Sequence, residues 1–153
     1  MPIQAGIPAP EFTLQDEKGE PCSLSDYRGT AVVLYFYPRD DTPGCTTEAC
    51  SFRDDYSSYQ QAGVTILGVS PDTPKKHTKF KAKYELPFTL LADTDHSVCE
   101  LYGVWGRKKY MGREYDGVLR TTFLIGADGK IVKVFENVKP DGHSAQILQT
   151  LAE

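Results

Sequence analysis

The chain has 153 residues, of which 40% are hydrophobic and 25% are charged. This length suits one buried core, so we expect a single domain over residues 1–153. The 17 basic and 21 acidic residues give a net charge of -4, which argues against nucleic acid and anionic membranes as partners. The longest apolar run, residues 31–37, is too short to cross a membrane, and residues 1–20 do not resemble a secretory signal.

Cysteine usage points to the compartment and to the chemistry. The four cysteines, Cys22, Cys45, Cys50 and Cys99, are too few and too scattered for a disulfide-stapled scaffold. This count predicts a reducing compartment, the cytoplasm. There, a close pair such as Cys45 and Cys50 serves redox chemistry or metal binding more often than structural crosslinking.

The first elements predicted along the chain are strands. Residues 12–14 and 22–24 are short extended runs around a polar turn at 16–20, which predicts an N-terminal hairpin. Residues 31–37 are β-branched and aromatic without polar alternation, which is typical of a central strand covered on both faces.

The helix predicted after this strand carries Cys45 and Cys50. Thr42 is a candidate cap and Pro43 suits the first helical position, so we expect a helix that ends near Ala62. Cys45 then lies in its first turn. A strand over residues 64–70 leads to a second cap and proline at Thr73 and Pro74 and to a lysine-rich helix. Its lysines fit a solvated face better than a binding patch.

The remaining pattern completes an α/β fold of three layers. Residues 88–92 predict a strand, residues 97–102 a short helix, and residues 144–151 a docked amphipathic helix. Residues 121–125 and 131–135 predict a hairpin around the turn at 127–130.

Cys45 is placed where a fold can make a thiol reactive. The positive end of a helix favours the thiolate form, and open α/β sheets bind ligands where strand ends meet helix N-termini. The alternative is a buried cysteine that packs as a small hydrophobic side chain. The backbone-rich sequence of Thr42, Pro43 and Gly44 favours an exposed loop and hence the reactive thiol.

Residues 37–50 resemble the active-site segment of the peroxiredoxins. Pro38, Thr42 and Cys45 match the family pattern Pro-x-x-x-Thr/Ser-x-x-Cys. The longer run Thr-Pro-Gly-Cys-Thr-x-Glu-x-Cys, which ends at Cys50, is similar to the peroxiredoxin Q or bacterioferritin comigratory protein branch. The resemblance extends along nearly the whole chain, through residues 9–12 near its start and residues 102–106 and 120–125 late in it.

The resemblance implies a thioredoxin-like fold, with a central mixed β-sheet flanked by helices and an N-terminal β-hairpin. It also implies a thiol-dependent peroxidase that reduces hydrogen peroxide and organic hydroperoxides in antioxidant defence, recycled by thioredoxin or a similar dithiol, and a monomer. The implied site residues are Cys45 (peroxidatic), Cys50 (resolving), Thr42 and Arg120 (polarising the peroxide and holding the thiolate), Pro38 (shielding the pocket) and Glu48 (orienting Arg120).

Each of these residue types suits the chemistry on its own terms. A thiolate that attacks a peroxide needs a fixed cation and hydrogen-bond donors on both oxygens, which Arg120 and Thr42 can supply without metal or organic cofactors. Simpler roles remain open: Arg120 as a surface residue, Thr42 as a helix cap, Pro38 as a strand terminator and Glu48 as a carboxylate that stabilises the helix dipole.

The spacing of Cys45 and Cys50 has a geometric consequence. In an intact helix, five positions separate two Cα atoms by about 8.6 Å and turn them by about 140° around the axis. A disulfide requires Cα atoms roughly 4.4–6.8 Å apart. The first turns must therefore unwind for Cys45 and Cys50 to bond.

The other cysteines and the histidines receive structural interpretations. Cys99 is either a reserve resolving thiol or, in the favoured reading, an ordinary buried one, and Cys22 reads as strand packing. His77, His96 and His143 have neither the spacing nor the neighbours of metal ligands.

Two further functions compete with the peroxidase. A general thioredoxin-like thiol-disulfide exchanger uses Cys-x-x-Cys, whereas four residues separate this pair. A metal-binding or redox-sensing thiol module would bind zinc through four convergent ligands at short paired spacings, a pattern this sequence lacks.

Overall fold

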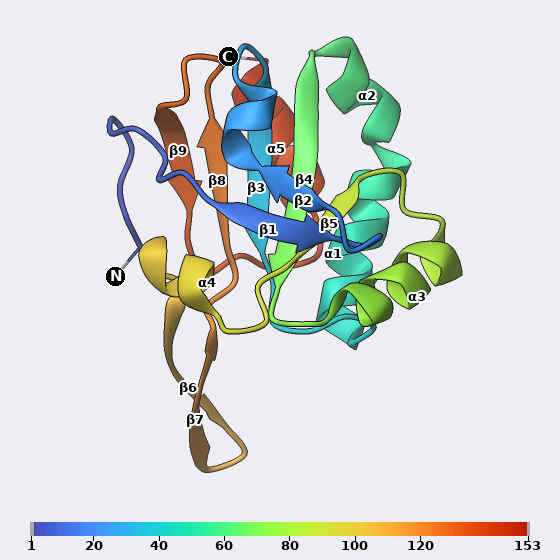
Figure 1. Cartoon of the computed structure of the whole chain (residues 1–153), viewed down its shortest axis with the longest axis vertical. Helices are drawn as coiled ribbons and strands as arrows, with labels where there is room; N and C mark the ends of the chain where they lie inside the picture. The colour runs from blue at the N-terminus through green and yellow to red at the C-terminus, as the bar shows by residue number, and fades with distance from the viewer. Residues whose placement is uncertain (1, 153) are drawn as a thin grey trace.

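A twisted seven-stranded sheet forms the centre of the computed structural model, which describes residues 2–152 (Figure 1). The strand order is β2-β1-β5-β4-β3-β8-β9, with β3, β4 and β5 parallel and the other pairings antiparallel. The predicted mixed sheet is therefore confirmed. The strands are β1 (Thr13–Asp16), β2 (Pro21–Ser23), β3 (Ala31–Phe36), β4 (Val64–Ser70), β5 (Thr89–Ala92), β8 (Thr121–Ile125) and β9 (Ile131–Phe135).

The predicted N-terminal hairpin is confirmed and extends the sheet. β1 pairs antiparallel with both β2 and β5, so the hairpin forms one edge of the sheet. Cys22 is buried in β2, as the packing interpretation required.

β3 occupies the predicted central position. It pairs in parallel with β4 and antiparallel with β8, and five of its six residues are buried. Its side chains alternate between two apolar cores: Val32, Leu34 and Phe36 pack on one face, while Val33 and Tyr35 pack on the other. This explains why the run lacks polar alternation.

Helices cover both faces of the sheet. The bounds are α1 (Pro43–Asp54), α2 (Tyr56–Gln61), α3 (Pro74–Tyr84), α4 (Ser97–Leu101) and α5 (His143–Leu151), with a short 3-10 helix at Leu24–Tyr27. α1, α2, α3 and α5 supply buried residues to one core, and α4 packs on the opposite face (Figure 1).

The prediction of one helix from Pro43 to Ala62 is wrong, because two helices meet at Asp55. Asp55 lies between them with φ -96° and ψ 7°. Its carboxylate accepts a hydrogen bond from Ser144 of α5 at 2.7 Å, and the Tyr59 hydroxyl donates to the Ser144 carbonyl at 2.9 Å. This tertiary contact fixes the break, so local helix propensity gives no sign of it.

A third hairpin, over residues 105–118, was not predicted from the sequence. β6 (Trp105–Tyr110) and β7 (Arg113–Val118) pair antiparallel and project from the end of the molecule at the bottom of Figure 1. Its turn uses Met111 (φ 50°) and Gly112 (φ 78°), both left-handed. Met-Gly is not one of the usual two-residue hairpin turns, and half of the residues in each strand are charged, so the sequence lacks the alternating apolar pattern of a hairpin.

None of the helices in residues 2–152 is long and apolar enough to span a bilayer.

Candidate active site

The site lies where β3 ends and α1 begins. The connecting loop covers residues 37–42, and its first amide, of Tyr37, still bonds the Val69 carbonyl at the end of β4. α1 starts at Pro43 as predicted, and Cys45 occupies its first turn. The thiol therefore lies at the carboxyl edge of the parallel strands, where open sheets bind ligands.

Arg120 reaches Cys45 although 75 residues separate them. Arg120 directly precedes β8, and the register places Thr121 beside Phe36 at the end of β3. From there its Nη2 donates to Cys45 Sγ at 3.2 Å and its Nη1 donates to Glu48 Oε1 at 2.7 Å. The surface alternative for Arg120 is wrong, since its side chain is only 16% exposed.

Burial and the neighbouring groups shift the pKa values of Arg120 and Glu48. Burial opposes the charge of Arg120, but Cys45 and Glu48 raise the pKa of its guanidinium above the ordinary value. Burial raises the pKa of Glu48 to about 7, against the opposing effect of Arg120. Glu48 is buried beyond the first turn, so the interpretation as a first-turn carboxylate is wrong. Instead it accepts a hydrogen bond from the Arg120 guanidinium at 2.7 Å.

Gly44 allows Arg120 to lie against the start of α1. A Cβ at position 44 would lie 3.2 Å from Arg120 Nη2 and 3.3 Å from Cγ of Pro140, so a side chain there would displace one of them. The sequence analysis treated Gly44 only as part of a loop. Only the tertiary contact reveals why the position requires glycine.

Thr42 does not cap α1 with its side chain. Its backbone has the extended conformation of an N-cap, but the hydroxyl donates to the Arg39 carbonyl at 2.9 Å. The capping interpretation of the hydroxyl is therefore wrong. The early amides of a helix have no intrahelical partner, so those of Gly44 and Cys45 can serve as donors to a substrate.

A groove of about 630 Å³ opens beside the site, between the loop after β3 and the β6–β7 hairpin. Half-buried Pro38 and Thr42 line one side of the groove. Trp105, Lys108 and other hairpin residues line the opposite side.

Lys108 is a second cation near the thiol that the sequence analysis missed. It is half-buried in the groove, and its Nζ donates to the Val118 carbonyl at 2.9 Å. Burial, together with the charge of Arg120, lowers the pKa of its ammonium. No pattern in the sequence pointed to Lys108, because it lies in the hairpin that was not predicted.

Cys50 lies in the same helix as Cys45. α1 runs without interruption through both positions, and both thiols are free, with Cys45 buried and Cys50 half-buried. The structure is therefore the reduced form, in which an intact helix holds the pair apart.

Cys99 lies in α4 and is fully buried. Burial, followed by the charge of Asp93, raises the pKa of its thiol. The favoured interpretation as an ordinary buried thiol fits this environment.

The histidines have structural partners, as expected. His77 and His143 are buried, and His143 bonds Thr122 and Gln146. His96 stacks on Trp105 with ring centroids 3.9 Å apart.

One group of side chains, Asp40, Asp72 and His77, has the proximity of metal ligands. Their atoms are already engaged: His77 bonds Asp40 at 2.6 Å and the Leu91 carbonyl at 2.9 Å, and Asp72 accepts from Ser70 and the Asp40 amide. We interpret the group as a hydrogen-bonded network.

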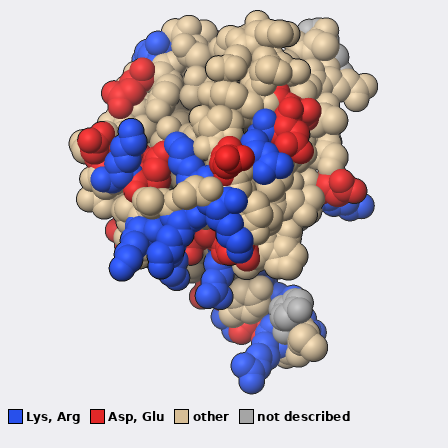
Figure 2. Space-filling view, turned by 90° about the vertical axis from the view of Figure 1, so that its right-hand side faces the viewer, with Lys and Arg blue, Asp and Glu red and all other residues tan. Residues whose placement is uncertain are grey.

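The α3 lysines form an exposed face, as predicted, except for Lys81. Lys81 is half-buried and pairs with Glu17 of the N-terminal hairpin. Figure 2 shows basic side chains gathered in a band across the lower half of the side of the molecule that α3 covers.

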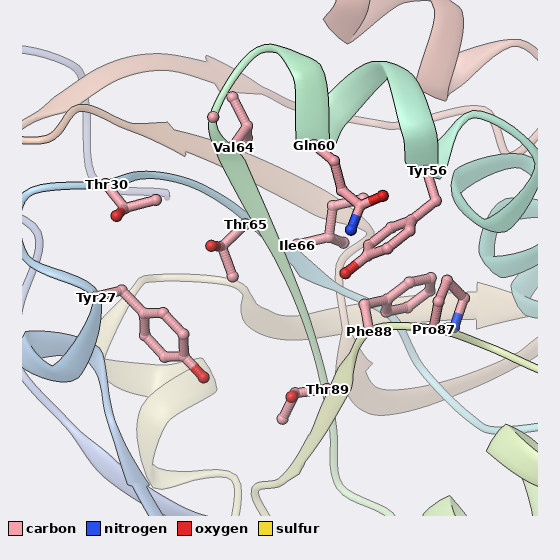
Figure 3. Close-up of a pocket in the computed structure, with 11 residues that line it drawn as sticks. Tyr27, Thr30, Tyr56, Gln60, Val64, Thr65, Ile66, Pro87, Phe88 and Thr89 are labelled. Atoms are coloured by element: carbon pink, nitrogen blue, oxygen red, sulfur yellow. The ribbon is translucent and has the colours of Figure 1, made fainter.

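A separate hollow lies at the opposite end of the strands (Figure 3). It has a volume of about 480 Å³ and is lined by residues at the beginning of β4 and β5 and by Tyr27, Tyr56 and Gln60. None of the residues that line it is a cysteine.

Comparison with known proteins agrees with this geometry. The model of the AhpC/TSA family matches residues 5–134. A putative peroxiredoxin Bcp from Coxiella burnetii is 54% identical over 151 residues, covering 99% of this chain and all of that protein. Peroxiredoxin Bcp from Bacillus subtilis is 50% identical over 153 residues, covering 100% of this chain and 98% of that protein.

The structural similarity extends over nearly the whole chain. Peroxiredoxin Q from Xanthomonas campestris superposes with a TM-score of 0.87 at 37% identity, covering 92% of this chain and 89% of that one. The fold and the site thus define a thiol-dependent peroxidase with a thioredoxin-like fold. The chain belongs to the AhpC/TSA family, and the predicted likeness to the peroxiredoxin Q branch is confirmed. Its substrate class is hydroperoxides and its reductant is a thiol.

Proposed function

We propose that Cys45 reduces hydroperoxides through a sulfenic acid and a Cys45–Cys50 disulfide, and that thioredoxin or a similar dithiol then reduces this disulfide. The observation that carries the proposal is the 3.2 Å contact between Arg120 Nη2 and Cys45 Sγ. A guanidinium stays protonated at all working pH values, so it stabilises the thiolate throughout the reaction.

In the first step the Cys45 thiolate attacks the terminal oxygen of the hydroperoxide. An S–O bond forms and the O–O bond breaks, leaving a sulfenic acid and an alkoxide or hydroxide that takes a proton to become alcohol or water. Arg120 and the amides of Gly44 and Cys45 are the donors that stabilise the charge on the separating oxygens. Thr42 and Pro38 position the substrate in the groove.

In the second step the Cys50 thiol attacks the sulfenic acid sulfur and releases water. Because α1 is intact through both cysteines, its first turns must unwind before this bond can form. Rapid capture protects Cys45 from further, irreversible oxidation. Unwinding and resolution are therefore one event.

The groove suits substrates larger than hydrogen peroxide. Its volume of about 630 Å³ and its lining by Pro38, Trp105 and Val118 leave room for an organic chain beside Cys45. A solved structure of the Xanthomonas campestris bacterioferritin comigratory protein, 36% identical to this chain, is described in terms of alkyl peroxide reduction. We extend that substrate class to this chain, acting as a monomeric, cytoplasmic, single-domain enzyme.

The test is Cys50→Ser. This variant should consume one equivalent of hydrogen peroxide, accumulate Cys45 sulfenic acid detectable by dimedone labelling, and lose turnover with thioredoxin. Mass spectrometry of the oxidised wild-type protein should find Cys45 linked to Cys50.

Cys99→Ser is the matched control, because it removes a thiol of the same chain and should keep both reactions. Normal thioredoxin-dependent turnover by Cys50→Ser would contradict the proposal and assign resolution to Cys99 or to an external thiol.

A further inference from the structure

The C-terminal end of α3 contacts both ends of α1 through a single residue. The Tyr84 hydroxyl donates to Asp41 Oδ1 at 2.8 Å, just before α1 begins. The Tyr84 carbonyl accepts from Arg53 Nη1 at 2.8 Å, in the last turn of α1. Tyr84 therefore bridges the two ends of the segment that carries both cysteines.

Asp41 needs such support. It has φ 60°, a left-handed conformation that a residue with a side chain adopts at a cost. Lys83 Nζ donates to its second carboxylate oxygen at 2.8 Å, beside the bond from Tyr84. These two bonds lower the pKa of the Asp41 carboxyl and keep it available as an acceptor.

The neighbouring residue, Asp40, is held by the first turn of α3. His77 Nε2 faces the Leu91 carbonyl, which can only accept, so this nitrogen carries a hydrogen. Its Nδ1 lies 2.6 Å from Asp40 Oδ2, and this contact requires one proton shared between the two. Asp40 also accepts from the Tyr37 hydroxyl at 2.6 Å. The loop before α1 thus has two consecutive anchors on α3.

These contacts bracket the segment that unwinds in the proposed disulfide step. In the wound state Cys45 lies against Arg120, and in the unwound state it can reach Cys50. We propose that α3 is a clamp that favours wound α1, with Tyr84 and His77 as positioning residues for the peroxide step. The role of Cys50 in this inference rests on the proposed function.

The clamp has opposite effects on the two steps. It keeps Cys45 beside Arg120, which speeds the reaction with peroxide, and it delays unwinding, which slows capture of the sulfenic acid. A sulfenic acid that waits longer is more exposed to a second peroxide and to conversion into sulfinic acid. A loosened clamp should therefore slow the first step, speed the second and reduce sulfinic acid formation.

Two mild surface substitutions test the clamp at its two ends: Tyr84→Phe removes the hydroxyl and Arg53→Ala removes the guanidinium. The matched controls are Tyr56→Phe, on α2, and Lys75→Ala, on the exposed face of α3. In the reduced proteins, hydrogen exchange of the amides of residues 48–53 should rise about threefold to tenfold in each test variant, as expected for one hydrogen bond. The controls should match wild type.

The same variants are then oxidised with a series of hydrogen peroxide concentrations, and disulfide and sulfinic acid are quantified by mass spectrometry. The test variants should need more peroxide than wild type for half conversion to sulfinic acid. Unchanged exchange in both test variants overturns the clamp. If exchange rises but mass spectrometry finds Cys45 linked to a cysteine other than Cys50, the clamp is supported and Cys50 is not the resolving residue. The clamp and the proposed function can therefore fail separately.

Discussion

Two buried cysteines at the beginnings of helices have opposite electrostatic surroundings. Cys45 in α1 is 1% exposed and Cys99 in α4 is fully buried. The first turn of α1 contains no acidic residue, and its thiol faces Arg120. At α4, the two carboxylate oxygens of Asp93 accept from the second and third helical amides, of Val98 and Cys99, at 3.1 and 2.8 Å.

The difference shows that neither burial nor a helix N-terminus is enough to make a thiol reactive. Asp93 satisfies the free amides of α4 and places a negative charge beside Cys99, which disfavours a thiolate. At α1 the amides remain available, because Thr42 does not cap them with its hydroxyl, and the nearest charge is a cation. The two thiols therefore differ in the sign of the neighbouring charge, which is positive at Cys45 and negative at Cys99.

The largest expected effect comes from replacing one of these two cysteines, Cys45, by serine, with the same replacement at Cys99 as the comparison. Cys45→Ser should abolish peroxide reduction, since a serine hydroxyl does not supply an anionic nucleophile. Cys99→Ser should leave the rate within about twofold of wild type, a change that reflects packing alone. A thioredoxin-coupled peroxidase assay measures both, and substantial turnover by Cys45→Ser would remove the basis of the comparison.

Removing Arg120 should take away the positive charge that distinguishes the surroundings of Cys45 from those of Cys99. We expect Arg120→Ala to slow the reaction of Cys45 with hydrogen peroxide about 100-fold, because both the thiolate and the breaking O–O bond lose a donor. Stopped-flow kinetics in a Cys50→Ser background isolates this step. A rate equal to that of the background would show that the helix amides are sufficient without Arg120.

Glu48 gives a prediction for stability against pH. Its folded-state pKa of about 7 lies above its ordinary value of 4.5, so the folded protein binds this proton more tightly than the unfolded chain. The stabilisation is complete below pH 4.5 and is lost as pH rises through 7, by about 3 kcal/mol in all. Urea unfolding at several pH values should show this decline in wild type, and Glu48→Gln should remove it. Parallel pH profiles for the two proteins would contradict the assignment.

The smallest effect concerns the close approach at Gly44. Gly44→Ala should force Arg120 or Pro140 to move by a few tenths of an ångström, which we expect to slow the peroxide step about threefold. The same stopped-flow assay measures it, with Ala49→Gly as a control substitution elsewhere in α1. A larger loss in the control would show that helix stability, rather than the position of Arg120, sets the rate.

The sequence by itself determined the elements that local patterns encode. Apolar runs and turn residues located β3, β4, β8 and β9, because strand burial and turn geometry depend on nearby residues. Pro43 marked the start of α1, and the motif around Cys45 identified the family and predicts that Cys45 is the reactive thiol.

Only the tertiary structure decided what depends on contacts between distant segments. Sheet register places Arg120 beside Cys45, and the bond to Ser144 accompanies the break at Asp55. Lys108 reaches the groove through a hairpin whose charged strands carry no apolar pattern. Each of these features depends on where another part of the chain packs, and local propensity does not contain that information.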